Sequence, residues 1–223
     1  MSVFREFSDL SAEPAVRGFL HEPAQPSSDG LVLTHGAGAN CQSKLLIALA
    51  EAFADAGCLV LRCDLPFRQS RPHGPPFPAA GARDREGLRR AVEVLRGKTP
   101  GRIFLGGHSY GGRQASMLLA AEPALASALL LQSYPLHPPG RPQNLRTAHL
   151  PDLRLPTLFV HGTTDTFGSL AEVDKARALI PGRTALLPVS GGHDLGWSRK
   201  HGDATLPERI AEAFLELAGP SER

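Results

Sequence analysis

The chain has 223 residues, 42% of them hydrophobic, and a formal net charge of +2 at pH 7. This length predicts one domain over residues 1–223, and the near-neutral charge argues against nucleic-acid and membrane partners. No stretch approaches the ~18 apolar residues of a membrane span. The first residues lack the layout of a signal peptide, and the three cysteines have no metal-ligand spacing. We therefore expect a cytoplasmic protein without a metal site.

Short apolar segments alternate with amphipathic segments along the chain. The expected strands cover residues 3–7, 16–20, 30–35, 58–62, 103–106, 128–131, 157–161 and 184–187. The expected helices cover residues 41–56, 84–95, 112–121, 170–179 and 207–217. The first two strands are expected to form an antiparallel edge hairpin, and the others a parallel sheet covered on both faces. The pattern predicts an α/β fold, a three-layer α/β/α sandwich with seven or eight mostly parallel strands. The connections are too short for a lid domain.

Prolines gather in two segments, residues 66–78 and 135–151. The chain holds 20 prolines in 223 residues, against a usual share of about 5%. Each segment follows the carboxyl end of an expected strand, and open parallel sheets bind ligands at that edge. We interpret both as rigid loops that line a site. Ordinary surface connections are the alternative interpretation.

The segment Gly107-His108-Ser109-Tyr110-Gly111 carries the strongest chemical signal. It is a G-x-S-x-G pattern between an expected strand and an expected helix. The flanking glycines allow close backbone packing, which pushes the serine hydroxyl outward. The helix that follows directs its N-terminal amides toward the reacting centre. The context predicts that Ser109 is a nucleophile.

A serine hydroxyl needs a general base and a group that orients the base. Asp165 follows the strand over residues 157–161, and His193 follows the last expected strand between glycines. The chain order serine, acid, histidine is the order expected for this arrangement. We predict Asp165 as the acid and His193 as the base. His161, His108 and Asp194 are expected to be structural.

The small residues His35-Gly36-Ala37-Gly38 follow another strand. They predict a backbone N–H at Ala37 that meets the oxyanion formed during attack, together with the N–H of Tyr110. A plain loop capped by Asn40 at the start of a helix is compatible with this role. His35 is expected to bond the local backbone. Cys41 falls near the same loop.

On these residues the chain resembles the α/β-hydrolase family, in particular its small, lidless, dienelactone-hydrolase-like branch. The resemblance extends from about residue 30 to the end. It implies a serine hydrolase that cleaves a small ester-like substrate through Ser109, His193 and Asp165 and an acyl-enzyme. Dienelactone hydrolases carry a cysteine where this chain has Ser109, so the resemblance does not imply lactone specificity.

Two other classes of function stay open at this point. One is a non-catalytic scaffold protein on the same fold, and the other is a thioesterase or peptidase. No cofactor motif is present, so none is expected. The natural substrate and the oligomeric state do not follow from the sequence.

Both proline-rich loops are basic and contain no acid. The first loop includes Arg68 and Arg71, and the second includes His137 and Arg141. A guanidinium can hold a carboxylate through two parallel hydrogen bonds. These four residues are therefore expected to line the substrate site and to favour an anionic group, with solvated surface cations as the alternative.

Overall fold

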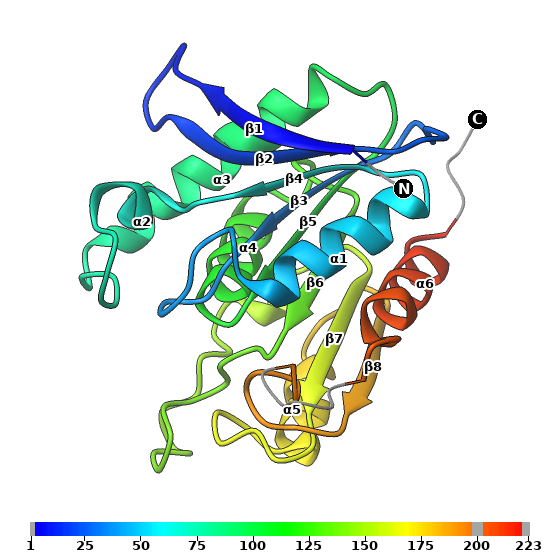
Figure 1. The fold of residues 1–223 in the computed structure, drawn as a ribbon. Coiled ribbons are helices and arrows are strands. Elements are labelled where there is room, and N and C mark those ends of the chain that lie inside the picture. The colour runs from blue at the N-terminus through cyan, green and yellow to red at the C-terminus, as the bar shows by residue number, and fades with distance from the viewer. Residues whose placement is uncertain (1–2, 198–202, 220–223) are drawn as a thin grey trace.

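The computed structural model describes residues 3–197 and 203–219. Its strands are β1 (Val3–Asp9), β2 (Val16–Glu22), β3 (Gly30–Thr34), β4 (Leu59–Cys63), β5 (Ile103–His108), β6 (Ala128–Gln132), β7 (Thr157–Gly162) and β8 (Thr184–Val189). Its helices are α1 (Lys44–Asp55), α2 (Pro66–Ser70), α3 (Ala80–Arg96), α4 (Tyr110–Ala121), α5 (Leu170–Arg177) and α6 (Leu206–Ala218), with a 3₁₀ turn at Leu150–Asp152. Figure 1 shows these elements alternating around one twisted sheet.

The eight strands form one sheet in the order β1-β2-β4-β3-β5-β6-β7-β8. β1 pairs antiparallel with β2, and β2 pairs antiparallel with β4. All other neighbours are parallel. The predicted edge hairpin and the mostly parallel sheet are confirmed. Parallel strands need crossover connections, which contain α-helices except between β6 and β7, where a loop with the 3₁₀ turn makes the connection.

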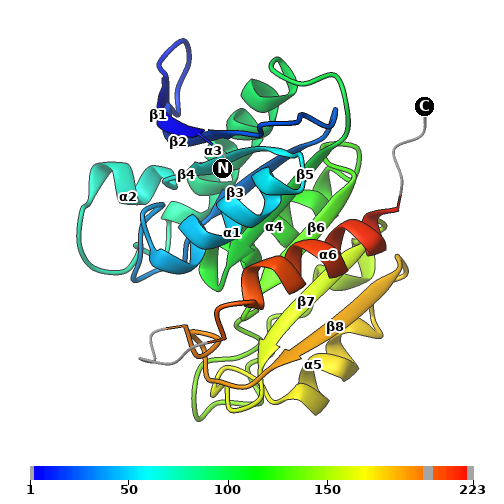
Figure 2. The ribbon, with the colours of Figure 1, turned by 45° about the vertical axis from the view of Figure 1, so that its right-hand side comes forward.

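Two hydrophobic layers cover the sheet, one on each face. Leu129 and Leu131 point to the layer that holds α3, α4 and α5, whereas Leu130 points to the layer that holds α1 and α6. Figure 2 shows α1 and α6 lying together on one face. Because side chains alternate along a strand, a strand buried on both faces is apolar throughout, as β6 is. The three-layer prediction is confirmed.

Several predicted boundaries differ from the observed ones. The first helix begins at Lys44 rather than at residue 41, and Ser43 rather than Asn40 precedes it. Asn40 instead accepts the N–H of Gln42 through Oδ1, at 2.9 Å. That side-chain bond closes a local turn, an alternative that asparagine offers to a helix cap.

The first proline-rich segment is not entirely a loop. It opens with the short helix α2, which begins at Pro66, a residue suited to the first helical position. α3 also begins one turn before the predicted start, at Ala80. The small residues of that turn carry no apolar periodicity, so the pattern could not reveal it.

Both proline-rich segments follow carboxyl ends of strands, β4 and β6, as predicted. In residues 3–197 and 203–219 no lid domain interrupts the alternation of strands and helices. None of the described helices is long and apolar enough to cross a bilayer.

Candidate active site

Ser109 lies at a strained turn between β5 and α4. Its φ of 50° falls in the left-handed region that side chains rarely adopt. Its N–H donates to the carbonyl of Gln132 at 2.8 Å, which fixes the turn to β6. A Cβ at Gly107 would lie 2.5 Å from the Gly112 nitrogen, and one at Gly111 would lie 2.5 Å from the His35 carbonyl oxygen. The glycines are therefore required by close approach, as the pattern predicts.

The side chains of Ser109, His193 and Asp165 form a continuous hydrogen-bonded chain. His193 Nε2 lies 2.7 Å from Ser109 Oγ, and His193 Nδ1 lies 2.8 Å from Asp165 Oδ2. An ionised carboxylate only accepts, so Nδ1 carries the proton and Nε2 accepts from the serine hydroxyl. Ser109 and His193 are 84 positions apart in the sequence, and the structure brings them together with Asp165 at one edge of the sheet.

The close approach of two loops brings His193 to Asp165. β7 and β8 are neighbours, and their following loops run side by side. Thr164 Oγ1 donates to the Gly191 carbonyl at 2.9 Å. A Cβ at Gly162 would lie 2.2 Å from the carbonyl oxygen of Gly192, so only glycine allows this contact.

Asp165 is held as a carboxylate. Its side chain is fully buried. Burial, the largest influence, raises its pKa, but the hydrogen bonds from His193 and from the Phe167 N–H outweigh burial, so the pKa lies below its ordinary value. The Phe167 N–H reaches Oδ1 at 2.9 Å, which leaves Oδ2 for the imidazole.

Two aromatic rings contact His193, one at its imidazole and one at its backbone carbonyl. Phe167 stacks on it with ring centroids 4.1 Å apart. His108 Nε2 donates to the His193 carbonyl at 2.9 Å, and burial lowers the pKa of His108 to about 4. His108 is therefore a neutral support of the loop, in agreement with its predicted structural role.

Two backbone amides belong to segments next to Ser109, that of Tyr110 directly after it and that of Ala37 in the loop packed against it. The Tyr110 N–H opens α4, and no described residue accepts it or the Ala37 N–H. A Cβ built on Gly36 would be 3.4 Å from Ser109 Cβ, so the segment before Ala37 packs directly against the serine. This placement is compatible with the oxyanion role that the sequence suggests for Ala37 and Tyr110.

Arg68 holds the loop that contains Ala37. The buried guanidinium donates to the carbonyls of Ala37 at 2.7 Å, Ala39 at 2.8 Å, Arg71 at 2.9 Å and Gly74 at 3.0 Å. Four of its five N–H groups are thereby committed to the backbone. Arg68 supports this loop rather than presenting a free cation to a substrate, which differs from its predicted role.

In the described part of the chain, the three other predicted lining residues form no hydrogen bond or ion pair with Ser109, His193 or Asp165. Arg71 is exposed and packs over Phe77, with its Nη1 3.2 Å from the Pro75 carbonyl. His137 is buried beside Glu172 of α5 at 3.6 Å. Arg141 is exposed in the second proline-rich loop. His137 is linked to the site indirectly, because its backbone N–H donates to the carbonyl of Phe167, the residue that stacks on His193.

Sequence reasoning missed two contributors to the site. Phe167 follows the acid by two positions, and no pattern marks it as the cover of an imidazole. Asp84 is buried in α3 and accepts the Tyr110 hydroxyl at 2.7 Å and the Phe67 N–H at 3.0 Å. Asp84 thereby ties α2 to the residue after Ser109, a link that only the tertiary fold shows. Among the described residues no cluster of His, Cys, Asp and Glu side chains could hold a metal ion.

A family model matches most of the chain and shows the family to which the protein belongs. A model described as an alpha/beta hydrolase domain matches residues 27–219, most of the chain. The protein belongs to the α/β-hydrolase family. Membership of this family indicates a hydrolase and leaves open which bond is cleaved.

Solved structures share the fold over nearly the whole chain. A dienelactone hydrolase from Anabaena variabilis has a TM-score of 0.73 and 21% identity, with 96% of each chain covered. An alpha-beta serine hydrolase homologue from Coxiella burnetii has a TM-score of 0.74 and 16% identity, covering 95% of this chain and 97% of that one. XC6422 from Xanthomonas campestris, described as an a/b serine hydrolase without lid, has a TM-score of 0.67 and 16% identity, covering 97% and 93%. The chain thus has the fold of the lidless, dienelactone-hydrolase-like members, as the resemblance implies.

One curated relative matches only a short stretch. Polyketide synthase ThaQ from Burkholderia thailandensis is 40% identical over 70 residues, which are 31% of this chain and 3% of that protein. The chain therefore spans a very small part of that relative's length.

Proposed function

We propose that this protein is a serine hydrolase that cleaves a small ester-like substrate through an acyl-enzyme on Ser109. The observation that carries the proposal is the unbroken path from Asp165 through His193 to Ser109, with hydrogen bonds of 2.8 and 2.7 Å. A hydroxyl, an imidazole and a carboxylate in this order form the arrangement that activates a serine.

In the first half of the reaction, Ser109 Oγ attacks the carbonyl carbon of the substrate. His193 Nε2 takes the hydroxyl proton, and Asp165 stabilises the imidazolium that results. The amides of Ala37 and Tyr110 donate to the oxyanion, and each such donor contributes on the order of 3 kcal/mol. His193 then gives its proton to the leaving alcohol, and the acyl group stays on Ser109.

In the second half, water replaces the alcohol. His193 Nε2 takes a proton from water, the resulting hydroxide attacks the acyl carbon, and the same amides hold the oxyanion. Collapse returns the proton to Ser109 Oγ and releases the carboxylic acid. Neither half needs a cofactor or a metal ion.

Labelling with a fluorophosphonate probe tests the nucleophile directly. We expect one covalent adduct on the unmodified protein, located at Ser109 by peptide mass spectrometry, and no adduct on Ser109→Ala. Ser190→Ala, which removes an exposed serine in the loop before His193, is the matched control and should label like the unmodified protein. Full labelling of Ser109→Ala would reject the proposal.

A substrate panel then separates the remaining classes. Matched oxygen esters, thioesters and amides of the same acyl group distinguish an esterase from a thioesterase or peptidase by their kcat/KM values. A protein that neither labels nor turns over any of them is the non-catalytic scaffold.

A further inference from the structure

A cavity of about 450 Å³ lies beside the residue that follows Ser109. It is bounded by the segment 76–79, the first turns of α3 and one face of α4. Among its lining residues are Phe77, Arg85, Tyr110, Arg113, Gln114 and Met117. Tyr110, Arg113, Gln114 and Met117 share a helical face, so the cavity runs along α4 away from Ser109. Arg113 lies one turn from the serine, about 6 Å along the helix axis.

Two arginines line this cavity without a carboxylate. In the described part of the chain neither Arg85 nor Arg113 forms an ion pair. Arg85 Nη1 donates to the Gln114 amide oxygen at 2.9 Å, and Arg113 Nε is buried with no partner among the described residues. By contrast, Arg89 on the same α3 pairs with Glu86 and Glu122. Removing a guanidinium from water without a charged partner is unfavourable, and these two partly buried groups have no carboxylate partner.

Arg146 adds a further positive charge to these surroundings, whereas the nearby histidine is neutral. Burial first, and then Arg113 and Arg85, lower the pKa of His149 to about 4 against the opposing influence of the Asp152 carboxylate. Burial and Arg113 also lower the pKa of Arg146. The carboxylate of Asp84 is nearby and accepts the Tyr110 hydroxyl and the Phe67 N–H, and it offsets part of this positive charge. Three guanidinium groups, those of Arg85, Arg113 and Arg146, outnumber the carboxylates of Asp84 and Asp152, so the cluster keeps a positive charge that favours an incoming anion.

We propose that this cavity is the subsite for an anionic oxygen group, a carboxylate or a phosphate, on a substrate whose carbonyl lies at Ser109. Arg85 and Arg113 hold the anion, and the apolar walls at Phe77 and Met117 contact the chain that links it to the carbonyl. The inference rests on the proposed ester hydrolysis for its placement of the carbonyl. It assigns the anion preference to helix residues, in place of the loop residues that the sequence suggests.

Two esters of equal chain length test the subsite. 4-Nitrophenyl hydrogen glutarate carries a terminal carboxylate, and 4-nitrophenyl pentanoate does not. We expect kcat/KM to favour the glutarate ester by about ten-fold or more, because hydrogen bonds to charged groups contribute at this level. The preference should fall several-fold in each of Arg113→Gln and Arg85→Gln and vanish in the double variant. Arg154→Gln, an exposed arginine before β7 at the opposite edge of the sheet, should keep it. Equal kcat/KM values for the two esters, or a preference that survives the double variant, would overturn the proposal.

A binding measurement separates this inference from the reaction itself. In Ser109→Ala, glutarate or inorganic phosphate in a cationic buffer at fixed ionic strength should raise Tm, and the double arginine replacement should abolish the rise. A larger rise with glutarate identifies a carboxylate site, and a larger rise with phosphate identifies a phosphate site. If neither anion raises Tm, the subsite is rejected even if the enzyme hydrolyses esters. A rise that depends on the arginines, in a protein that hydrolyses no ester, would keep the subsite and reject the proposed function.

Discussion

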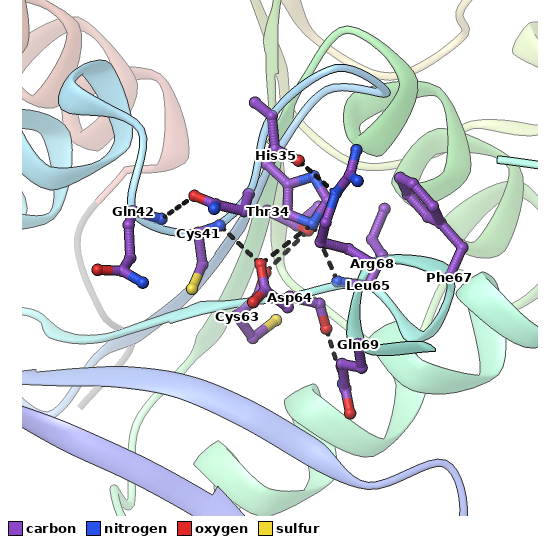
Figure 3. Close-up of polar contacts among 12 residues, drawn as sticks. Thr34, His35, Cys41, Gln42, Cys63, Asp64, Leu65, Phe67, Arg68 and Gln69 are labelled. Atoms are coloured by element: carbon purple, nitrogen blue, oxygen red, sulfur yellow. Dashed lines mark hydrogen bonds and ion pairs between the residues drawn. The ribbon is translucent and has the colours of Figure 1, made fainter. Parts of the chain in front are cut away.

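The pairs His193–Asp165 and His35–Asp64 lie at the same edge of the sheet, and of these two pairs only the first has an imidazole nitrogen directed at a hydroxyl. His193 contacts Asp165 through Nδ1 and Ser109 through Nε2. His35, after β3, lies 3.4 Å from Asp64, after β4. Figure 3 shows the second pair, with Asp64 between His35 and the Cys41 backbone.

Backbone groups occupy both ring nitrogens of His35. Its Nδ1 donates to the Gly36 carbonyl at 2.8 Å, and its Nε2 accepts the Leu65 N–H at 3.1 Å. The imidazole is therefore neutral, and burial lowers its pKa. Asp64 accepts the Cys41 N–H at 2.7 Å instead of a ring proton.

The neighbouring thiol confirms that this second cluster is not arranged for nucleophilic chemistry. Cys41 is buried, and burial raises the pKa of its thiol to about 12. A thiolate is the reactive form, so this cysteine is inert at neutral pH. The same residue types thus give different chemistry according to which atoms the backbone leaves available.

The largest effect is expected from His193. His193→Ala should lower kcat for an ester about 10⁴-fold or more, because the serine loses its proton acceptor. The comparison variant is His35→Gln, whose main effect should be a lower Tm. Initial-rate kinetics and thermal unfolding of both proteins check this. A comparable loss of kcat in both, with intact folds, would contradict the contrast.

Arg68 is expected to have the next largest effect. Arg68→Met removes the hydrogen bonds to the carbonyls of Ala37 and Ala39 and so loosens the proposed oxyanion amide. A displaced donor costs about 10²-fold in kcat, with a smaller change in KM. Arg71→Met, which replaces an exposed neighbouring arginine, should lose less. A loss confined to KM would assign Arg68 to substrate binding instead.

Acidification is expected to change the contributions of His35 and Asp165 to the free energy of unfolding in different pH ranges. The unfolded chain protonates His35 below its ordinary pKa of about 6.5, whereas the folded protein keeps it neutral to lower pH. The unfolded state then binds more protons, so stability falls as pH decreases below about 6.5, by at most ~1.4 kcal/mol per pH unit for one histidine. Asp165 has a lowered pKa, so its contribution is lost only below about pH 4.

Urea unfolding between pH 7 and pH 5 measures this dependence. The slope of unfolding free energy against pH should be smaller in His35→Gln than in the unmodified protein. His73→Gln replaces an exposed histidine and should leave the slope unchanged. An unchanged slope in His35→Gln would show that His35 is protonated in the folded state.

The smallest effect is expected from Cys41. In the folded protein at pH 8, a disulfide exchange reagent should react with none of Cys41, Cys58 and Cys63, because all three are buried and burial raises each thiol pKa. Absorbance of the released thiol should reach three equivalents only in denaturant. Rapid reaction of Cys41 in the folded protein would contradict the comparison between the clusters.

Much of the fold and part of the candidate site could be predicted because they depend on local pattern. Apolar strands alternating with helices indicate a parallel sheet, and the ends of its strands meet at one edge. Ser109, Asp165 and His193 could be selected because each follows a strand in a recognisable setting. The glycines around Ser109 could be interpreted because close approach excludes a side chain.

Only the tertiary structure decided which polar groups remain available. Arg68 and Arg113 are both arginines near Ser109 in space, yet Arg68 donates to four backbone carbonyls, whereas Arg113 has no partner at Nε. His35 and His193 both follow strands, yet the ring nitrogens of His35 bond backbone atoms, whereas those of His193 bond side chains. A residue's type and position along the chain indicate what it could bind. Its hydrogen-bond partners are brought close by contacts between distant segments, which a local sequence pattern does not contain.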